Sequence, residues 1–184
     1  MRVKPRILER RTVAQTRIFR VEQMDLQFAN GTLAQYERIM GAGGGAVLVV
    51  PMLDADTVLL IREYAAGTDR YELGLPKGKV EEEESLFDAA NREIMEEVGY
   101  GARRLRHIAS LSLAPGYIAY HTHVILAEEL YPRREEGDEP EEIEVVPWRL
   151  SELWDLTQQD DFTEARSLAA LFMVRETLLN DLHD

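Results

Sequence analysis

Hydrophobic and polar residues alternate over much of the N-terminal stretch, as they do in a half-buried antiparallel sheet. The segment TRIFRVEQMDLQF is rich in residues that favour strands. The dipeptide Asn30-Gly31 follows it and is the strongest short signal for a β-hairpin. Residues 41–45, GAGGG, then predict a flexible joint, because glycine permits many backbone conformations. We therefore expect a small antiparallel strand region ahead of the joint.

The main body begins with two runs that are apolar without alternation, AVLVVPML at 46–53 and TVLLIREY at 57–64. Such runs predict strands that are buried on both faces. Four further segments favour short or alternating strands: RYELGLP, RLRHIASLSL, AYHTHVILAEEL and EVVPWRL.

Two stretches have helical periodicity instead. Ser85 to Val98 begins with a Ser-x-x-Asp capping pattern and ends before Gly99, as an N-cap and a C′ glycine predict. The segment FTEARSLAALFMVRETLLNDL predicts a C-terminal amphipathic helix with Thr163 as its N-cap. The order of strands, helix, strands and helix predicts an α/β fold with a mixed sheet between helices.

Composition narrows the class of protein. A chain of 184 residues with 45% hydrophobic residues can build one domain with a real core. Its net charge of −13 argues against binding nucleic acid or an anionic membrane through a broad basic surface. The absence of cysteine excludes disulfides and thiolate chemistry. No secretory signal and no apolar run of about 20 residues is present, so we expect a cytoplasmic protein.

Seven glutamates lie between Glu81 and Glu97, a density at which like charges repel. On a helix, Glu93, Glu96 and Glu97 fall within an arc of about 100°. Clustered carboxylate oxygens suit a hard divalent cation, Mg²⁺ or Mn²⁺, and Mg²⁺ commonly shares its ligands with a phosphate substrate. The alternative is a solvated acidic helix face, which is the commoner role of such residues.

The spacing of these residues resembles a known family motif. Gly78, five residues, Glu84, seven residues and then Arg92-EIMEEVGY match the Nudix box, in which Tyr100 occupies a position where an aliphatic residue is commoner. The resemblance covers roughly residues 44 to 180. It implies the Nudix α/β/α sandwich with a mixed sheet and a metal-dependent pyrophosphohydrolase.

The resemblance also implies roles for individual residues. Arg92 would orient the metal-binding glutamates, and the divalent cations would be held by Glu93, Glu96, Glu97 and the backbone carbonyl of Lys77. The general base lies on a late loop in the ADP-sugar pyrophosphatase branch. The matching segment here, GDEPEEIEVV, indicates Glu139, with Glu141 as the second candidate. The alternative is an ordinary exposed acidic loop.

Pro115 lies fifteen residues beyond Tyr100, where the ADP-sugar pyrophosphatase branch has a proline, although a plain Pro-Gly turn would use the same residues. The neighbouring Tyr117 would either stack on a nucleobase or pack against the protein. Within the branch the chain is most similar to the NudE-type group of bacterial ADP compounds hydrolases. This resemblance implies cleavage of ADP-ribose, NADH and diadenosine polyphosphates with release of AMP.

Two positions depart from the branch. Many ADP-ribose hydrolases have a phosphate-contacting arginine where this chain has Ala65, and Arg62 is the candidate substitute. Gly74 replaces a common glutamate. These differences leave open hydrolysis of other nucleoside diphosphate sugars or of nucleoside triphosphates.

The N-terminal strand region, residues 1–43, resembles the small exchanged domain of dimeric ADP-sugar pyrophosphatases, with the Nudix domain at 44–184. The resemblance therefore implies a homodimer. An alternative of another class is a non-catalytic Nudix module that senses nucleotides, although such modules usually lose glutamates of the box.

Overall fold

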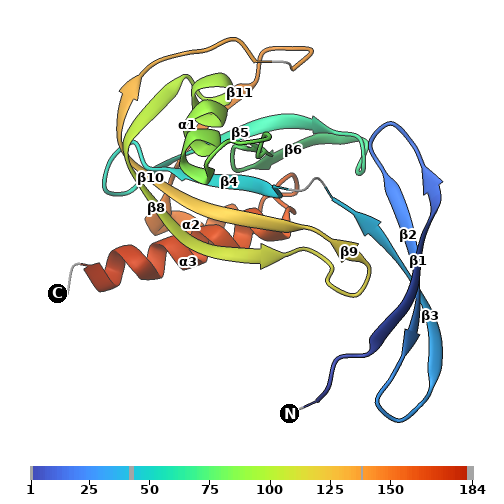
Figure 1. Ribbon diagram of the computed structural model, residues 1–184. Coiled ribbons are helices and arrows are strands. Elements are labelled where there is room, and N and C mark those ends of the chain that lie inside the picture. The colour runs from blue at the N-terminus through green and yellow to red at the C-terminus, as the bar shows by residue number, and fades with distance from the viewer. Residues whose placement is uncertain (1, 42–43, 138, 182–184) are drawn as a thin grey trace. The chain divides into compact units, whose positions relative to one another are not determined.

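The computed structural model describes residues 2–41, 44–137 and 139–181. The chain divides into two units, and the positions of its parts relative to one another are not determined (Figure 1). The first unit comprises Met1–Gly45 with Ser112–His121, and the second comprises Ala46–Leu111 with Thr122–Asp184. Two residues of the expected glycine joint, 42 and 43, lie outside the described residues.

The N-terminal unit is a sheet whose strand order is β1-β2-β3-β9. Its strands are β1 (Arg6–Gln15), β2 (Arg20–Gln27), β3 (Leu33–Met40) and β9 (Ile118–Ala119). The predicted hairpin joins β2 to β3, and Gly31 takes the left-handed conformation that the turn requires, with φ of 84°. The short strand β9, far along the chain, pairs in parallel with the end of β3. The sequence gives no local signal for this pairing.

The second unit holds the strands that the apolar and alternating segments predict, together with one short strand at 77–79 that no segment predicts. They are β4 (Ala46–Pro51), β5 (Thr57–Ala65), β6 (Arg70–Gly74), β7 (Lys77–Lys79), β8 (Tyr100–Ser112), β10 (His121–Pro132) and β11 (Glu144–Arg149). They form one sheet in the order β7-β4-β10-β8 and a smaller one in the order β11-β5-β6. The first is mixed, because β4 pairs in parallel with β10 and antiparallel with β7. The predicted mixed sheet is therefore confirmed.

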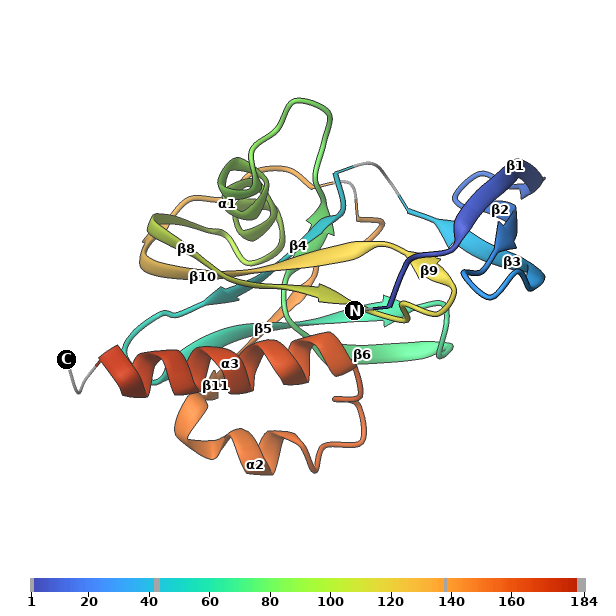
Figure 2. The same ribbon diagram turned by 60° about the horizontal axis from the view of Figure 1, so that its bottom comes forward.

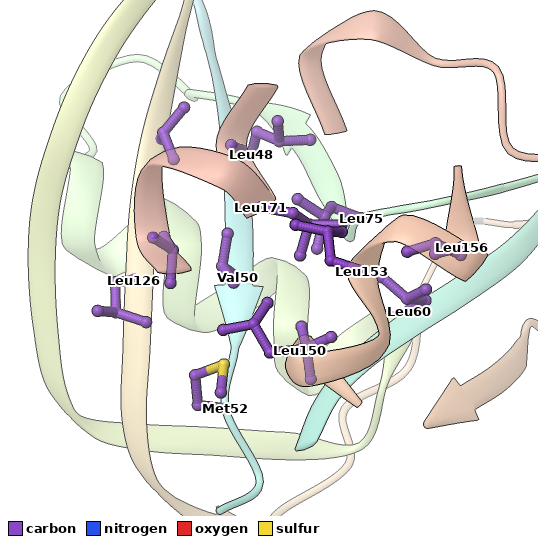
Figure 3. Close-up of a cluster of buried hydrophobic side chains, with 14 of the residues drawn as sticks. Leu48, Val50, Met52, Leu60, Leu75, Leu126, Leu150, Leu153, Leu156 and Leu171 are labelled. Atoms are coloured by element: carbon purple, nitrogen blue, oxygen red, sulfur yellow. The ribbon is translucent and has the colours of Figure 1, made fainter. Parts of the chain in front are cut away.

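Helices cover both faces of these sheets (Figures 1 and 2). They are α1 (Leu86–Glu97), α2 (Leu153–Leu156) and α3 (Ala165–Asp181), with a 3₁₀ turn at Leu150–Glu152. Alternate residues of β4 serve the two faces: Val47 and Val49 join the cluster under α1, while Leu48 and Val50 join the cluster under α3. Figure 3 shows the second cluster, in which Leu171 of α3 lies close to Leu75. The expectation of strands buried on both faces is thus confirmed.

Helix α1 begins and ends where its caps predict. The Ser85 hydroxyl accepts the backbone N–H of Asp88 at 3.1 Å, and Gly99 follows the helix with φ of 76°. Its inward-facing residues Ala90, Ile94 and Val98 are buried against the sheet. Among the described residues, no helix has the length and apolar character needed to cross a membrane.

The expected cap of α3 is wrong by one residue. Thr163 donates its hydroxyl to Glu72, while the carboxylate of Glu164 accepts from the backbone N–H of Ser167 at 2.7 Å and from its hydroxyl at 2.9 Å. Glutamate is not among the residues preferred at the N-cap, so the capping pattern of the sequence does not indicate Glu164. Ser167 is fully buried and accepts the N–H of Leu75 at 3.0 Å. The cap therefore also anchors the chain that leads from β6 to β7.

Replacing Glu164 by alanine should lower the free energy of unfolding by about 1–2 kcal/mol, since a cap and a charge-assisted bond are lost. Hydrogen bonds from Arg166 and Ser167 lower the pKa of Glu164, although burial opposes them. A lowered pKa contributes stability above the unfolded-state value near 4.5, and this stability is lost as the pH falls below it. Urea unfolding at pH 7 and pH 3 should show a larger deficit at pH 7; an equal deficit would contradict the ionic cap.

Candidate active site

Helix α1 and strand β7 place the glutamates of the motif on the wall of one cavity. This acidic cavity has a volume of about 520 Å³, and its lining includes Glu93, Glu96, Glu97, Lys77 and Glu139. The four expected metal ligands and the first candidate base therefore line one cavity. Three of them, Glu93, Glu96 and Glu97, belong to helix α1, which is labelled in Figure 1.

Two of the glutamates are buried although they carry charge when ionised. Glu93 is 6% exposed and Glu97 is 3% exposed. Glu97 accepts the backbone N–H of Lys77 at 2.8 Å. Burial raises the pKa of Glu97 to about 8, against the opposing effect of Lys77, and burial also raises the pKa of Glu93. These carboxylates are costly in the fold unless a positive group neutralises them.

Arg92 is the positive group that contacts the acidic cluster in this structure. Its guanidinium donates to both oxygens of Glu84, at 2.9 and 3.1 Å, and to the backbone carbonyl of Lys79 at 3.0 Å. It also donates to Glu93 at 2.7 Å and to Glu96 at 3.2 Å. One arginine thus fixes the loop before the helix to the helix itself and orients two glutamates.

Gly78 allows the strand to approach the helix closely. A side-chain carbon at this position would overlap the carboxylate of Glu93. Glycine at this position therefore leaves room for the carboxylate of Glu93, which any larger residue would displace.

The loop after β10 brings Glu139 to the same cavity. The backbone N–H groups of Arg133 and Glu135 donate to the carbonyls of Gly99 and Met95, which pins this loop to the end of α1. A side-chain carbon at Gly137 would overlap the carboxylate of Glu139 and would lie 3.6 Å from Cβ of Glu96. Glu139 therefore lies beside Glu96. Asp138, which lies between Gly137 and Glu139 in the sequence, is outside the described residues.

Glu141, the second candidate base, is held elsewhere. Its carboxylate accepts the hydroxyl of Tyr71 at 2.6 Å, and it does not line the acidic cavity. Tyr71 in turn stacks edge-on against Tyr64, with ring centroids 5.8 Å apart. Of the two candidates, Glu139 therefore shares the acidic cavity with Glu93, Glu96 and Glu97, and Glu141 does not.

The predicted substrate contacts belong to both units of the chain. Arg62 is bound by Glu144 at 2.7 Å and by Asp161 at 3.1 Å, and it is absent from the lining of the acidic cavity. Pro115 and Tyr117 line a cavity of about 550 Å³ within the N-terminal unit. Contacts of these three residues with a substrate stay predictions.

The acidic cavity also has lining residues that no sequence motif indicates, among them Glu63. Glu63 lies at its wall and pairs with the ammonium group of Lys77 at 2.8 Å. It belongs to β5, whose apolar run gave no sign of a functional carboxylate. Only the tertiary structure brings it to Lys77, because β5 and β7 belong to different sheets.

The acidic cavity fits a divalent cation by its chemistry. Its donors are carboxylate oxygens, two of them buried, together with a backbone strand that approaches closely at Gly78. In the described part of the chain, no three acidic or histidine side chains converge as they stand on a point that could hold a metal ion. Glu93 and Glu96 instead contact the guanidinium of Arg92.

Comparison with known proteins covers nearly the whole chain. Residues 44–172 match the NUDIX domain, and residues 5–38 match the NudE-type Nudix hydrolase N-terminal domain. The chain is 49% identical to the ADP compounds hydrolase NudE of Escherichia coli (strain K12), over 95% of this chain and 94% of that protein. It is 30% identical to an ADP-ribose pyrophosphatase of Bacillus subtilis (strain 168), over 89% and 91%.

A solved structure agrees with the fold. A crystal structure of an ADP compounds hydrolase superposes with a TM-score of 0.92 at 47% identity, covering 98% of this chain and 97% of that one. The predicted α/β/α sandwich with its additional N-terminal strands is therefore confirmed.

Proposed function

This chain belongs to the Nudix hydrolase family, and we propose that it cleaves the pyrophosphate bridge of ADP-linked compounds and releases AMP. The observation that carries the proposal is the acidic cavity, where Glu93, Glu96 and Glu97 of one helix face Glu139 of a distant loop. Two relatives support the substrate class, since one is an ADP compounds hydrolase and the other an ADP-ribose pyrophosphatase.

The residues that would hold Mg²⁺ or Mn²⁺ are Glu93, Glu96, Glu97 and the carbonyl of Lys77. A bound divalent cation supplies positive charge that offsets the charge developing on the diphosphate during cleavage. The chain contributes the orientation of these ligands. Arg92 holds Glu93 and Glu96, and the N–H of Lys77 holds one oxygen of Glu97.

Glu139 is the proposed general base. It would take a proton from water as the water oxygen forms a bond to one phosphorus of the bridge. The bond between that phosphorus and the bridging oxygen breaks, and the bridging oxygen leaves with the other phosphate. For ADP-ribose the products are AMP and ribose 5-phosphate. The half-buried position of Glu139 beside Glu96, one of the proposed metal ligands, supports this role.

A substrate panel tests this proposal. Initial rates with ADP-ribose, NADH, diadenosine polyphosphates, GDP-mannose and dGTP should be highest for the ADP-linked compounds, with AMP as a product. GDP-mannose belongs in the panel because a GDP-mannose pyrophosphatase of Salmonella paratyphi B is 25% identical to this chain. Faster cleavage of GDP-mannose or dGTP would replace the ADP-linked class by another Nudix substrate class.

Tight binding of ADP-ribose without any cleavage would instead support a non-catalytic sensor. The retained glutamates of the acidic cavity weigh against a sensor, because a binding module has no need of a base beside a metal site.

We also propose that two copies assemble through the N-terminal strands. Every residue of β1 is exposed, including Ile7, Leu8 and Val13. An edge strand with exposed apolar side chains is a surface that commonly pairs with another chain. Light scattering should give twice the 21.0 kDa mass of one chain. A mass of one chain at micromolar concentration would contradict the dimer.

Cytoplasmic location stays a prediction.

A further inference from the structure

A second cavity adjoins the acidic cavity in the same unit. This side cavity has a volume of about 270 Å³ and lies between β5, β6 and the start of α3. Glu63 and Lys77 line both cavities, and their ion pair of 2.8 Å therefore forms the wall between them. Both side chains of this pair are partly exposed, so they can move apart at moderate cost. A ligand held in the acidic cavity can thus extend into the side cavity.

The side cavity exists because three of its lining residues have little or no side chain. Ala65 ends β5, Gly67 follows in the turn, and Gly74 ends β6. A side-chain carbon at Gly67 would meet no atom within 4 Å, whereas one at Gly74 would meet the Ser167 hydroxyl at 3.3 Å. Both Ala65 and Gly74 stand where the sequence departs from the ADP-ribose hydrolase pattern. Those two departures now have a common consequence, which is open volume beside the acidic cavity.

The walls of the side cavity suit one ring with apolar faces. Its floor is made by Ile61, Leu73 and Leu75, which are buried and apolar. A volume of this size is near the lower limit of ligand sites, about 300 Å³. It therefore accommodates one ring, and any further part of a larger ligand would lie outside it.

The polar lining of the side cavity is rich in acceptors. Three carboxylates, those of Glu63, Glu72 and Glu164, line it together with one ammonium group, that of Lys77. The hydroxyls of Thr68 and Thr163 add further polar atoms. Excess negative charge disfavours another phosphate group, while acceptor oxygens bind the hydroxyl groups of a neutral sugar. The side cavity thus selects a neutral, hydroxyl-bearing ring.

We propose that the side cavity is the subsite for the sugar that lies across the diphosphate from the AMP half of the substrate. This inference rests on the proposed function, because the acidic cavity must hold the diphosphate. Ala65 and Gly67 are then specificity-determining residues: their small size admits the sugar of ADP-ribose. A ligand that ends at the diphosphate, such as ADP, leaves the side cavity empty.

Ala65→Leu tests the subsite, with Ala66→Leu as its matched control. Ala66 is the next residue, is exposed, and does not line the side cavity. In Ala65→Leu, KM for ADP-ribose should rise about tenfold, because the larger side chain takes up space that the sugar would occupy in the side cavity. The inhibition constant of ADP against ADP-ribose should stay within twofold, and Ala66→Leu should change neither constant. Gly67→Val should reproduce the selective effect without a clash, which covers the case that Ala65→Leu fails to fold.

Two results would overturn the subsite. One is a KM for ADP-ribose that stays within twofold in both Ala65→Leu and Gly67→Val. The other is a parallel rise of the KM for ADP-ribose and the inhibition constant of ADP, which would place the shared ADP part in the side cavity. If wild-type protein leaves ADP-ribose uncut, the proposed function fails instead. In that case the subsite is tested by calorimetry. The dissociation constant of ADP-ribose should rise about tenfold in Ala65→Leu and Gly67→Val, while that of ADP should stay within twofold.

Discussion

Glu139→Gln should lower kcat for ADP-ribose by a factor of about 10² to 10⁴, the usual contribution of a general base. The amide has nearly the same shape as the carboxylate and cannot take a proton from water. Because Glu139 lies beside Glu96 in the acidic cavity, the loss should fall on kcat and not on KM. Steady-state kinetics with saturating Mg²⁺ measure both constants.

Glu141→Gln is the matched control for this experiment. The two glutamates lie two residues apart, but Glu141 accepts from Tyr71 and lies outside the acidic cavity. We expect Glu141→Gln to retain kcat within about threefold, since its hydrogen bond from Tyr71 can be kept by the amide oxygen. A large loss in Glu141→Gln with less than a threefold change in Glu139→Gln would exchange their roles.

Glu97→Gln should raise the Mg²⁺ concentration that gives half-maximal activity by at least about tenfold, since even a partner outside the ligand shell contributes that much. The amide oxygen can still accept the N–H of Lys77, so the geometry is retained while the charge is removed. The buried position of Glu97 makes this charge effective, because little water screens it. Mg²⁺ titrations of the initial rate measure the shift.

Glu82→Gln serves as the control for charge in the same stretch of chain. Glu82 is exposed in the loop before α1 and does not line the acidic cavity. Its removal should leave the Mg²⁺ titration unchanged within twofold. An unchanged titration in Glu97→Gln, or an equal shift in Glu82→Gln, would contradict a ligand role for Glu97.

Much of the fold could be predicted because local rules agree with the tertiary structure. The caps of α1 are read from Ser85 and Gly99, and the buried strands from unbroken apolar runs. The hairpin at Gly31 follows from a dipeptide that tolerates the left-handed conformation. In each case the signal lies within a few residues of the element that it predicts.

Contacts between distant segments could not be predicted in this way. Residues 112–121 join the N-terminal unit through the pairing of β9 with β3, which is a non-local event. The cap of α3 by Glu164 depends on Ser167 being buried under Gly74, which only packing decides. A short 3₁₀ turn and α2 also escaped, because their few residues have no measurable periodicity.

The same limit applies to the candidate site. Helical spacing places three glutamates on one arc, but it does not show that Glu93 and Glu97 are buried. Helical spacing also does not show that Glu63 forms an ion pair with Lys77, or that Glu141 accepts a hydrogen bond from Tyr71 outside the acidic cavity. The burial of Glu93 and Glu97 distinguishes this cluster from a solvated acidic face, which is the commoner role of such residues.

Release of AMP from ADP-ribose, followed with and without divalent metal, tests the central claim most directly. Purified protein treated with a chelator should release no AMP, and addition of Mg²⁺ or Mn²⁺ should restore equal amounts of AMP and ribose 5-phosphate. Equal rates with and without the metal, or intact ADP-ribose after metal is restored, would contradict the account.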